Sequence, residues 1–140
     1  MADHPNIDRI RVGYEAFFKG DFAALDDFLD ENVVWHEDGR NQFAGTYNGR
    51  NEVYSFFGRL MESTGGTFNL EVHSILADDE HGVALVNASG SRDGGTMASH
   101  GVHVMHLRDG RVAEFWAAST NQYAVDDLFG RSTAKSVQRA

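Results

Sequence analysis

The sequence contains no cysteine, which excludes a disulfide framework, thiol catalysis and any cysteine-ligated metal. It is also poor in positive charge: 12 Lys and Arg residues are scattered among 21 Asp and Glu residues, and the formal net charge is −9. Nucleic acids and anionic membranes bind clustered Lys and Arg, so neither is expected as a main partner. No apolar run approaches the ~18–20 residues of a membrane span, and the N-terminus lacks the basic and apolar regions of a signal peptide. These absences predict a soluble protein of the cytoplasm.

The size and composition predict a single globular domain. The chain has 140 residues, of which 41% are hydrophobic and 11% aromatic. A chain of this length builds one core, and this share of apolar residues is enough to fill it. We expect one domain over residues 1–130 and a flexible tail over residues 131–140.

A long antiparallel hairpin is predicted over Thr96–Asn121. Two runs rich in apolar and β-branched residues flank Asp109-Gly110, a pair that supplies the positive φ angles of a tight turn. This turn fixes which residues share a face. The predicted inner face carries His103, Met105, Leu107, Val112, Glu114 and Trp116. The predicted outer face carries Val104, His106, Ala113, Phe115 and Ala117.

Three helices and a strand are predicted in the first half of the chain. Apolar residues recur at helical spacing over Pro5–Lys19, over Asp21–Leu29 and over Arg50–Ser63. Asn32–Glu37 is short, β-branched and aromatic, which is typical of a strand. The polar, glycine-rich stretch Asp38–Gly49 is predicted to be a loop.

Strands dominate the second half. Thr67–Ala77 and Val83–Arg92 are predicted strands that precede the hairpin, joined by turns rich in Asp and Gly. Asn121–Phe129 is predicted to form a short terminal helix. Helices therefore come first and antiparallel strands later, an order that predicts an α+β fold with a curved sheet wrapped over the helices.

The order of elements and three local strings resemble the SnoaL-like group of the nuclear transport factor and ketosteroid isomerase superfamily. The strings are GDFAALDDFLDENVVWHEDG, AGTYNGRNEVYSFFGRLM and HLRDGRVAEFW. The resemblance implies a cystatin-like α+β barrel, a cone closed at one end by helices with a ligand pocket inside. It also implies a homodimer through the outer face of the sheet, where Val102, Val104, Phe115 and Ala117 are expected. The superfamily includes isomerases, cyclases, epoxide hydrolases, dehydratases and non-catalytic binding domains, so the fold leaves the reaction open.

Glu37 and His103 are the candidate catalytic residues that the resemblance implies. Glu37 shares a strand face with Trp35 and aligns with the isomerases' carboxylate base, and burial beside an indole would raise its pKa. His103 falls near the isomerases' protonated carboxyl, where it could donate to an oxyanion or act as an acid or base. The alternatives are a solvated glutamate at a strand end and a core histidine bonded to a backbone carbonyl.

Tyr14 would complete an isomerase triad, but the isomerases' tyrosine aligns with Gly13. A step of one residue turns about 100° around a helix. Tyr14 is therefore predicted either to present its hydroxyl to the pocket or to be only a core aromatic residue.

Further ligand-binding candidates surround the predicted pocket. Glu114 is expected beside His103 as a base or orienting group, with pairing to Arg92 or Arg108 as the alternative. Asn121 follows the last strand, where some polyketide cyclase relatives carry a functional aspartate, and an amide cannot act as a base near neutral pH. The expected pocket walls, for which plain core packing is the alternative, are Trp35, Phe57, Met61, Met105 and Trp116.

The histidine spacing argues against a metal site. In a strand, His103 faces away from His100 and His106, and those two lie about 20 Å apart, too far to share an ion. No glycine-rich phosphate cradle or nucleophilic serine motif is present, and no cofactor is expected. The sequence predicts a pocket protein that performs cofactor-free acid–base chemistry on a small apolar carbonyl or polycyclic compound. The alternative is a non-catalytic domain for hydrophobic-ligand binding or dimerisation.

Overall fold

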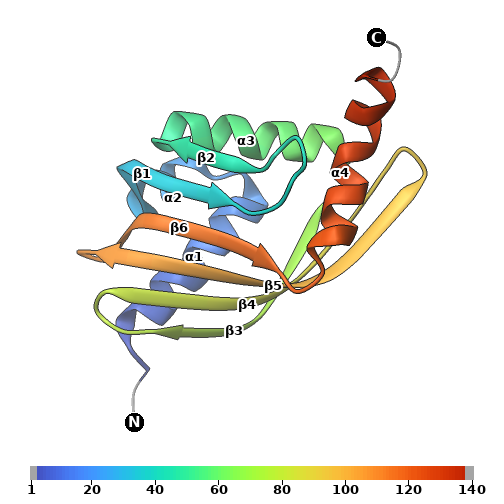
Figure 1. The fold of residues 1–140 in the computed structure, drawn as a ribbon. Helices are drawn as coiled ribbons and strands as arrows, with labels where there is room; N and C mark the ends of the chain where they lie inside the picture. Colours follow the sequence, from blue (N-terminus) through green and yellow to red (C-terminus); the bar gives the residue numbers. More distant parts are fainter. Residues whose placement is uncertain (1–2, 138–140) are drawn as a thin grey trace.

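The computed structural model describes residues 3–137 of the chain and the side chains of residues 3–130. The helices and strands of this part are arranged as Figure 1 shows. The helices are α1 (Pro5–Lys19), α2 (Phe22–Phe28), α3 (Arg50–Ser63) and α4 (Gln122–Val137). The strands are β1 (Leu29–Glu37), β2 (Gly45–Asn48), β3 (Asn69–Ala77), β4 (His81–Arg92), β5 (Gly95–Arg108) and β6 (Arg111–Ser119).

The strands form one sheet in the order β2-β1-β6-β5-β4-β3. Neighbouring strands are antiparallel except β1 and β6, which pair in parallel. Figure 1 shows a curved sheet with α1 and α2 behind it and α3 near its β2 edge, while α4 packs at one end against β5. The α+β fold with a curved sheet wrapped over the N-terminal helices is confirmed.

Local sequence signals account for the ends of the first two helices. Gly20 ends α1 with a φ of 66°, a left-handed conformation that glycine adopts without steric cost. The Asp21 carboxylate caps α2 by accepting a hydrogen bond from the backbone N–H of Ala24 at 3.1 Å. The bounds of α1 and α3 agree with those predicted from apolar spacing.

The first strand and the loop after it differ from the prediction. β1 begins at Leu29 rather than at Asn32. The segment predicted to be a loop contains β2, an edge strand that pairs with β1. The sequence of β2, GTYN, carries no apolar alternation, so hydrogen bonding to β1 rather than its own pattern makes it a strand.

Helix α4 is longer than predicted. It begins at Gln122 and continues past Phe129 to Val137, so the segment predicted to be a flexible tail is helical as far as Val137. The remainder of that predicted tail, residues 138–140, lies outside the described residues. None of the described helices is long and apolar enough to cross a membrane.

The predicted hairpin turn is confirmed, and a bulge follows it. Asp109 and Gly110 have positive φ angles of 54° and 79°. His106 pairs with Glu114, which leaves Ala113 as an extra residue on β6 between this pair and the turn. An extra residue shifts every later pair by one position, and because side chains alternate, it exchanges the two faces of that strand.

The bulge corrects the predicted faces of β6. Glu114 and Trp116, predicted to face inward, lie on the outer face of the sheet. Phe115 and Ala117, predicted to face outward, lie on the inner face, where Phe115 is buried. The outer face that was expected to form the dimer therefore lacks Phe115 and Ala117 and presents Trp116 instead.

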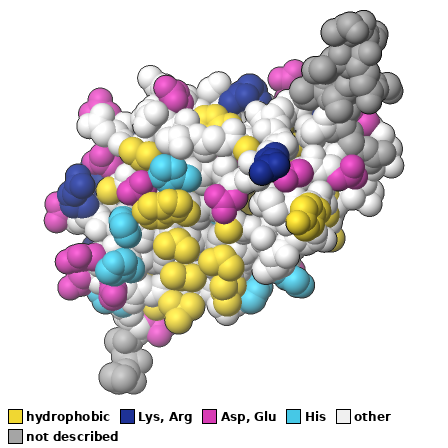
Figure 2. Space-filling model, viewed as in Figure 1, with side chains coloured by type: hydrophobic (Ala, Val, Ile, Leu, Met, Phe, Trp, Pro, Cys, Tyr) yellow, Lys and Arg dark blue, Asp and Glu magenta, His cyan; other side chains and the backbone are white. Residues whose placement is uncertain are grey.

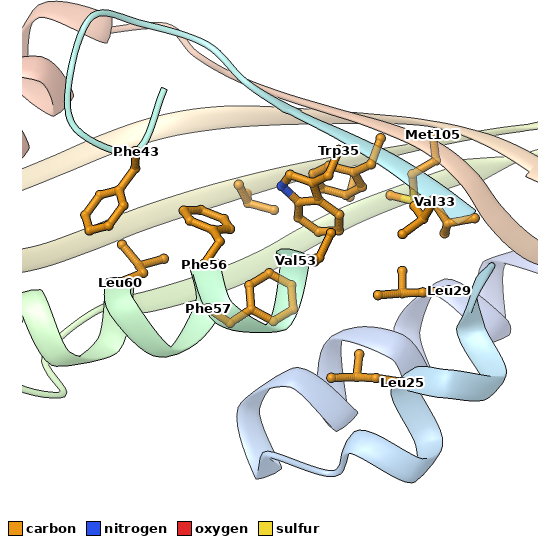
Figure 3. Close-up of a cluster of buried hydrophobic side chains, with 14 of the residues drawn as sticks. Leu25, Leu29, Val33, Trp35, Phe43, Val53, Phe56, Phe57, Leu60 and Met105 are labelled. Atoms are coloured by element: carbon orange, nitrogen blue, oxygen red, sulfur yellow. The ribbon is translucent and has the colours of Figure 1, made fainter. Parts of the chain in front are cut away.

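A hydrophobic core joins the inner face of the sheet to the helices. Figure 3 shows side chains from α2, α3, β1 and β5 that point toward one another across this space. Ile10, Leu29, Val33 and Met105 are each at most 1% exposed. Burial of a side chain of this size contributes about 1.5–3 kcal/mol to folding.

Candidate functional site

A cavity of about 150 Å³ lies between the inner face of the sheet and the helices. Its lining is mostly apolar, and aromatic rings from the helices and the sheet supply much of it. The apolar aromatic residues in the lining are Phe17, Phe28, Trp35, Phe43, Phe56, Phe57, Phe68, Phe115 and Phe129. The lining residues with polar side chains are Tyr14, Glu37, Asp38, Asn41, Ser99, His103, Ser119 and Gln122.

Three inward-facing residues form a row across the sheet through this cavity. Glu37 on β1 pairs with Ala117 on β6, and Ala117 pairs with His103 on β5. Neighbouring strands lie about 4.8 Å apart, so the Cα atoms of Glu37 and His103 are separated by roughly 10 Å. Only the methyl group of Ala117 stands between them. The row therefore leaves room for a small molecule between a carboxyl group and an imidazole.

Glu37 is held by its neighbour on the same strand face. The indole Nε1 of Trp35 donates a hydrogen bond to Oε2 of Glu37 at 2.7 Å. Burial raises the pKa of Glu37 to about 8, although the hydrogen bond from Trp35 lowers it; the charge of Asp38 adds to the increase. This direction agrees with the expectation for a carboxyl group buried beside an indole. Glu37 is half-buried in the cavity lining and bonded to Trp35, which differs from the alternative of a solvated glutamate at a strand end.

His103 forms a hydrogen-bonded pair with Tyr14. The distance between Tyr14 Oη and His103 Nδ1 is 2.5 Å, and the two rings stack with centroids 5.8 Å apart. Burial lowers the pKa of His103 to about 4 and raises that of the Tyr14 phenol above its usual value. Both groups are therefore neutral at pH 7. His103 bonds to a side chain rather than to a backbone carbonyl, which corrects the alternative reading.

The packing of α1 explains why Tyr14 presents its side chain to the cavity while the neighbouring position 13 is a glycine. Tyr14 is one helical turn from Ile10, which is fully buried against the sheet. At Gly13, a Cβ atom would lie only 2.4 Å from the ring of Phe28 on α2. Position 13 therefore faces α2, and only glycine allows this close approach. Tyr14 lines the cavity, as one of the two predicted alternatives states.

Three of the predicted pocket walls line the cavity. Trp35 stacks on Phe115 with ring centroids 3.6 Å apart, and Phe57 meets the edge of Trp35 at 5.3 Å. Met105 is fully buried and also lines the cavity. These residues come from β1, β6, α3 and β5, so the aromatic wall connects the sheet to a helix.

Two predicted wall or ligand residues lie elsewhere. Met61 is 36% exposed and lies outside the cavity lining, because the inward face of α3 is formed by Phe56, Phe57 and Leu60. Asn121 is exposed in the turn before α4, where its Oδ1 accepts a hydrogen bond from the backbone N–H of Ala124 at 3.3 Å. Asn121 is a helix cap here and not a lining residue.

The outward turn of Glu114 and Trp116 gives them other partners. Glu114 Oε2 lies 2.7 Å from His36 Nε2. The partner of Glu114 in this ion pair is therefore His36 and not Arg92 or Arg108, as the predicted alternative had it. Trp116 stacks with the same His36 ring at 5.3 Å. Neither residue lines the cavity.

Sequence reasoning missed Phe115, Ala117 and Gln122 as lining residues. Phe115 and Ala117 were assigned to the wrong face because a bulge residue such as Ala113 has no distinctive sequence pattern. Gln122 opens α4, whose length and position depend on tertiary contacts. The sequence offered one indication that polar residues line this end of the cavity, namely the predicted role of Asn121, the residue before Gln122.

Within the described residues, no group of three or more histidine or acidic side chains is arranged to hold a metal ion. His100 and His106 lie on the outer face and have different neighbours: Nδ1 of His100 lies 2.5 Å from Asn87 Oδ1, whereas His106 packs against Trp116. His103 is on the inner face, as predicted.

Comparison with known proteins agrees with this fold. The SnoaL-like domain profile matches residues 10–115. The structure of Bal32a from a soil-derived mobile gene cassette is 32% identical, with a TM-score of 0.84 over 89% of this chain and 95% of that one. A cystatin-like protein from Xanthomonas campestris is 29% identical, with a TM-score of 0.84 over 91% and 100%. Protein Rv0034 of Mycobacterium tuberculosis is 25% identical over 84% of this chain and 92% of its own. The chain belongs to the SnoaL-like domain family.

Proposed function

We propose that this protein performs general acid–base chemistry on a small apolar carbonyl or polycyclic compound, without a cofactor. One observation carries the proposal: Glu37 and the hydrogen-bonded pair of His103 and Tyr14 face one apolar cavity, with only Ala117 between them in the sheet. Such chemistry needs one group that takes a proton from carbon and another that stabilises charge on oxygen. Glu37 and His103 suit these two roles.

The proposed step balances without a co-reactant. Ionised Glu37 takes a proton from the carbon next to the carbonyl, and the C–H electron pair forms an enolate. The enolate oxygen accepts a hydrogen bond from neutral His103, and Glu37 returns the proton to a second carbon. The proposed role requires the tautomer in which the Tyr14 hydroxyl donates to His103 Nδ1 and the imidazole proton is on Nε2. Among the described residues, His103 forms its hydrogen bond through Nδ1, so in this tautomer Nε2 can donate to a ligand.

Replacement of Glu37 by Gln separates catalysis from binding. We expect Glu37→Gln to lose turnover by about 10²–10⁴-fold and to keep ligand affinity, because the amide has the same shape but accepts no proton. Turnover is measured on carbonyl substrates from a screen, and affinity by isothermal titration calorimetry. Glu114→Gln changes a carboxyl on the outer face and should leave both quantities unchanged. Full turnover by the Glu37 variant would show that the base is another group.

The raised pKa of Glu37 gives the proposed reaction a pH dependence. Only the carboxylate form accepts a proton, so kcat/KM should rise as the pH increases through about 8. A profile that is flat from pH ~6 to ~9 would contradict this role.

The second candidate function is a non-catalytic binding domain, in which the cavity holds a hydrophobic ligand. The protonation of Glu37 favours it, because a carboxyl with a pKa of about 8 is mostly neutral at pH 7 and can donate to a ligand oxygen. In that case, no carbonyl compound that binds in the cavity is turned over by the wild-type protein, and Glu37→Gln changes affinity alone.

We also propose that two copies of the chain associate through the outer face of the sheet. Figure 2 shows a group of hydrophobic side chains in the middle of this face, bordered by histidine and acidic side chains. The strand register places five neighbouring apolar residues there, which we call the outer apolar patch: Val83, Leu85, Val102, Val104 and Trp116. A contiguous exposed apolar patch of this kind favours association with another apolar surface.

A further inference from the structure

We infer that the cavity selects a compound with a single ring and one carbonyl or phenolic oxygen over a polycyclic compound. The inference rests on the proposed ligand site and narrows its ligand class. It concerns binding and not turnover, so it can be tested separately from the proposed catalysis.

The cavity volume is the first argument. The cavity measures about 150 Å³. An apolar cavity of ~150 Å³ holds a molecule of the size of benzene. Pockets that enclose drug-sized ligands measure about 300–1,000 Å³. A ligand with three or four fused rings would therefore have to displace wall side chains.

The packing around the cavity shows which side chains would have to move. The next inward-facing row beside Glu37 and His103 consists of Trp35, Phe115 and Met105, which are 8%, 3% and 0% exposed. Trp35 and Phe115 stack at 3.6 Å, so no ring fits between them. This row closes one side of the site, and enlargement in that direction would break close aromatic packing.

The helix side is closed in the same way. Phe57 on α3 meets Phe17 on α1 edge to face at 4.9 Å and Trp35 at 5.3 Å. Phe57 itself is 9% exposed. These rings offer flat apolar surfaces to one ring of a ligand. Further rings attached on these two sides would meet Phe57 or the Trp35–Phe115 stack.

The polar groups of the cavity explain why the ligand should carry one oxygen atom. Glu37, His103 and Tyr14 lie in the mostly apolar wall of the cavity: Glu37 and His103 flank Ala117 in one row, and Tyr14 is hydrogen-bonded to His103. They can satisfy one ligand oxygen on the His103 side. Glu37 and Tyr14 already have hydrogen-bond partners in Trp35 and His103, so His103 Nε2 is the atom that a ligand without any oxygen would leave unpaired, and this weakens binding.

The test is a series of phenols that differ only in ring number: 4-methylphenol, 2-naphthol and a four-ring phenolic steroid. Affinity is measured by calorimetry, and the site of binding by fluorescence of the Trp116→Phe variant, in which Trp35 is the only tryptophan. We expect 4-methylphenol to bind saturably with a change in Trp35 emission, and each larger phenol to bind about tenfold or more weakly. Nonspecific hydrophobic binding strengthens with apolar area and would produce the opposite order.

Paired variants test the volume argument directly. Ala117→Leu fills the space between Glu37 and His103, and should weaken 4-methylphenol binding about tenfold or more. Ala98→Leu adds the same volume at an exposed position of β5 and should leave affinity unchanged. Phe57→Ala should admit 2-naphthol. Phe57→Leu makes a smaller change and serves the same purpose if the alanine variant does not fold.

Two results would overturn the inference: tighter binding of the steroid than of 4-methylphenol to the wild-type protein, or no saturable binding of any phenol. Different results would contradict the proposed acid–base function. If single-ring ligands bind but Glu37→Gln leaves turnover unchanged, the acid–base assignment is wrong and the ligand class stands. If a polycyclic carbonyl binds more tightly and is turned over with dependence on Glu37, the ligand class is wrong and the proposed function stands.

Discussion

Burial acts in opposite directions on the pKa values of Glu37 and His103. It raises the pKa of the carboxyl to about 8 and lowers that of the imidazole to about 4, because in both cases the charged form loses hydration. Near pH 7, Glu37 is therefore mostly a carboxylic acid and His103 a neutral imidazole. Two largely uncharged groups suit an apolar cavity, and the carboxylate that the proposed reaction needs is the minor form at this pH.

The pKa of Glu37 also predicts how stability depends on pH. The folded-state pKa of about 8 lies above the ordinary value of 4.5, so the folded protein holds this proton more tightly than the unfolded chain. The resulting stability is complete below about pH 4.5 and is lost as the pH rises through about 8. Between pH ~5 and ~8 the loss should be on the order of 3 kcal/mol in the free energy of unfolding.

Glu37→Gln removes this titration, and denaturant unfolding at several pH values measures it. The wild-type protein should lose stability relative to the variant as the pH rises over this interval. The titration of His103 contributes to both proteins, so it cancels in their difference. Parallel curves for the two proteins would contradict the raised pKa.

At the scale of single elements, the bulge in β6 decides what this strand presents to the cavity. The extra residue Ala113 turns Phe115 and Ala117 inward and Glu114 outward. Without Ala113, Glu114 instead of Phe115 would pair with Met105 and face the cavity. An acidic group would then be buried in the aromatic wall, which is costly unless it is paired. The bulge therefore makes the wall apolar and leaves Glu37 as the carboxyl group opposite His103.

Asp126 joins helix α4 to the loop after β1 through hydrogen bonds. Its Oδ1 accepts hydrogen bonds from Arg40 N at 3.0 Å, Asn41 Nδ2 at 2.8 Å and Gln122 Nε2 at 3.0 Å. Burial acts to raise the pKa of Asp126, but these hydrogen bonds outweigh it and hold the pKa below its usual value. Gly39 allows the loop to approach, since a Cβ atom there would lie 2.4 Å from Asp126 Oδ1.

Asp126→Ala should loosen this end of the cavity, because Asn41 and Gln122 of the lining lose their common acceptor. We expect the dissociation rate of a bound phenol to rise by about tenfold, from the loss of hydrogen bonds worth about 0.5–1.5 kcal/mol each. Stopped-flow fluorescence measures the rate. Asp127→Ala, at an exposed neighbouring position of α4, is the matched control. Equal rates for the two variants would show that Asp126 does not hold the cavity closed.

At the scale of the whole molecule, the two faces of one sheet have separate proposed tasks. The inner face lines the ligand cavity, and the outer face carries the apolar patch that contains Trp116 and Val104. Because side chains alternate along each strand, changes to one face leave the other largely intact. Binding and association can therefore be altered independently.

The proposed dimer is tested by placing a charge in the outer apolar patch. Val104 is 37% exposed at its centre, and Val104→Asp would bury an unpaired carboxylate in each copy of the interface. We expect a wild-type dimer in sedimentation velocity and a shift of the variant to monomer. Val12→Asp, on α1 at a position 55% exposed, should remain dimeric. A wild-type protein that is monomeric at tens of micromolar would contradict the proposal.

The sequence by itself determined most of the secondary structure and the class of the fold. The apolar spacing in α1 and α3, the Asp109-Gly110 turn and the glycine after α1 act over a few residues, so they can be recognised without knowledge of the rest of the chain. The inward direction of Trp35, Glu37, His103 and Met105 followed from alternation within strands that contain no bulge at those positions.

Only the tertiary structure decided how these residues meet. The Ala113 bulge arises where β6 pairs with both β1 and β5, and the bond between Tyr14 and His103 joins residues 89 positions apart. The strand β2 depends on hydrogen bonds to β1. The cavity volume depends on side chains from helices and strands far apart in the chain. Register, cavity size and long-range bonds reflect the packing of distant segments, whereas periodicity and turn chemistry are local, and this difference separates what the sequence determined from what the fold decided.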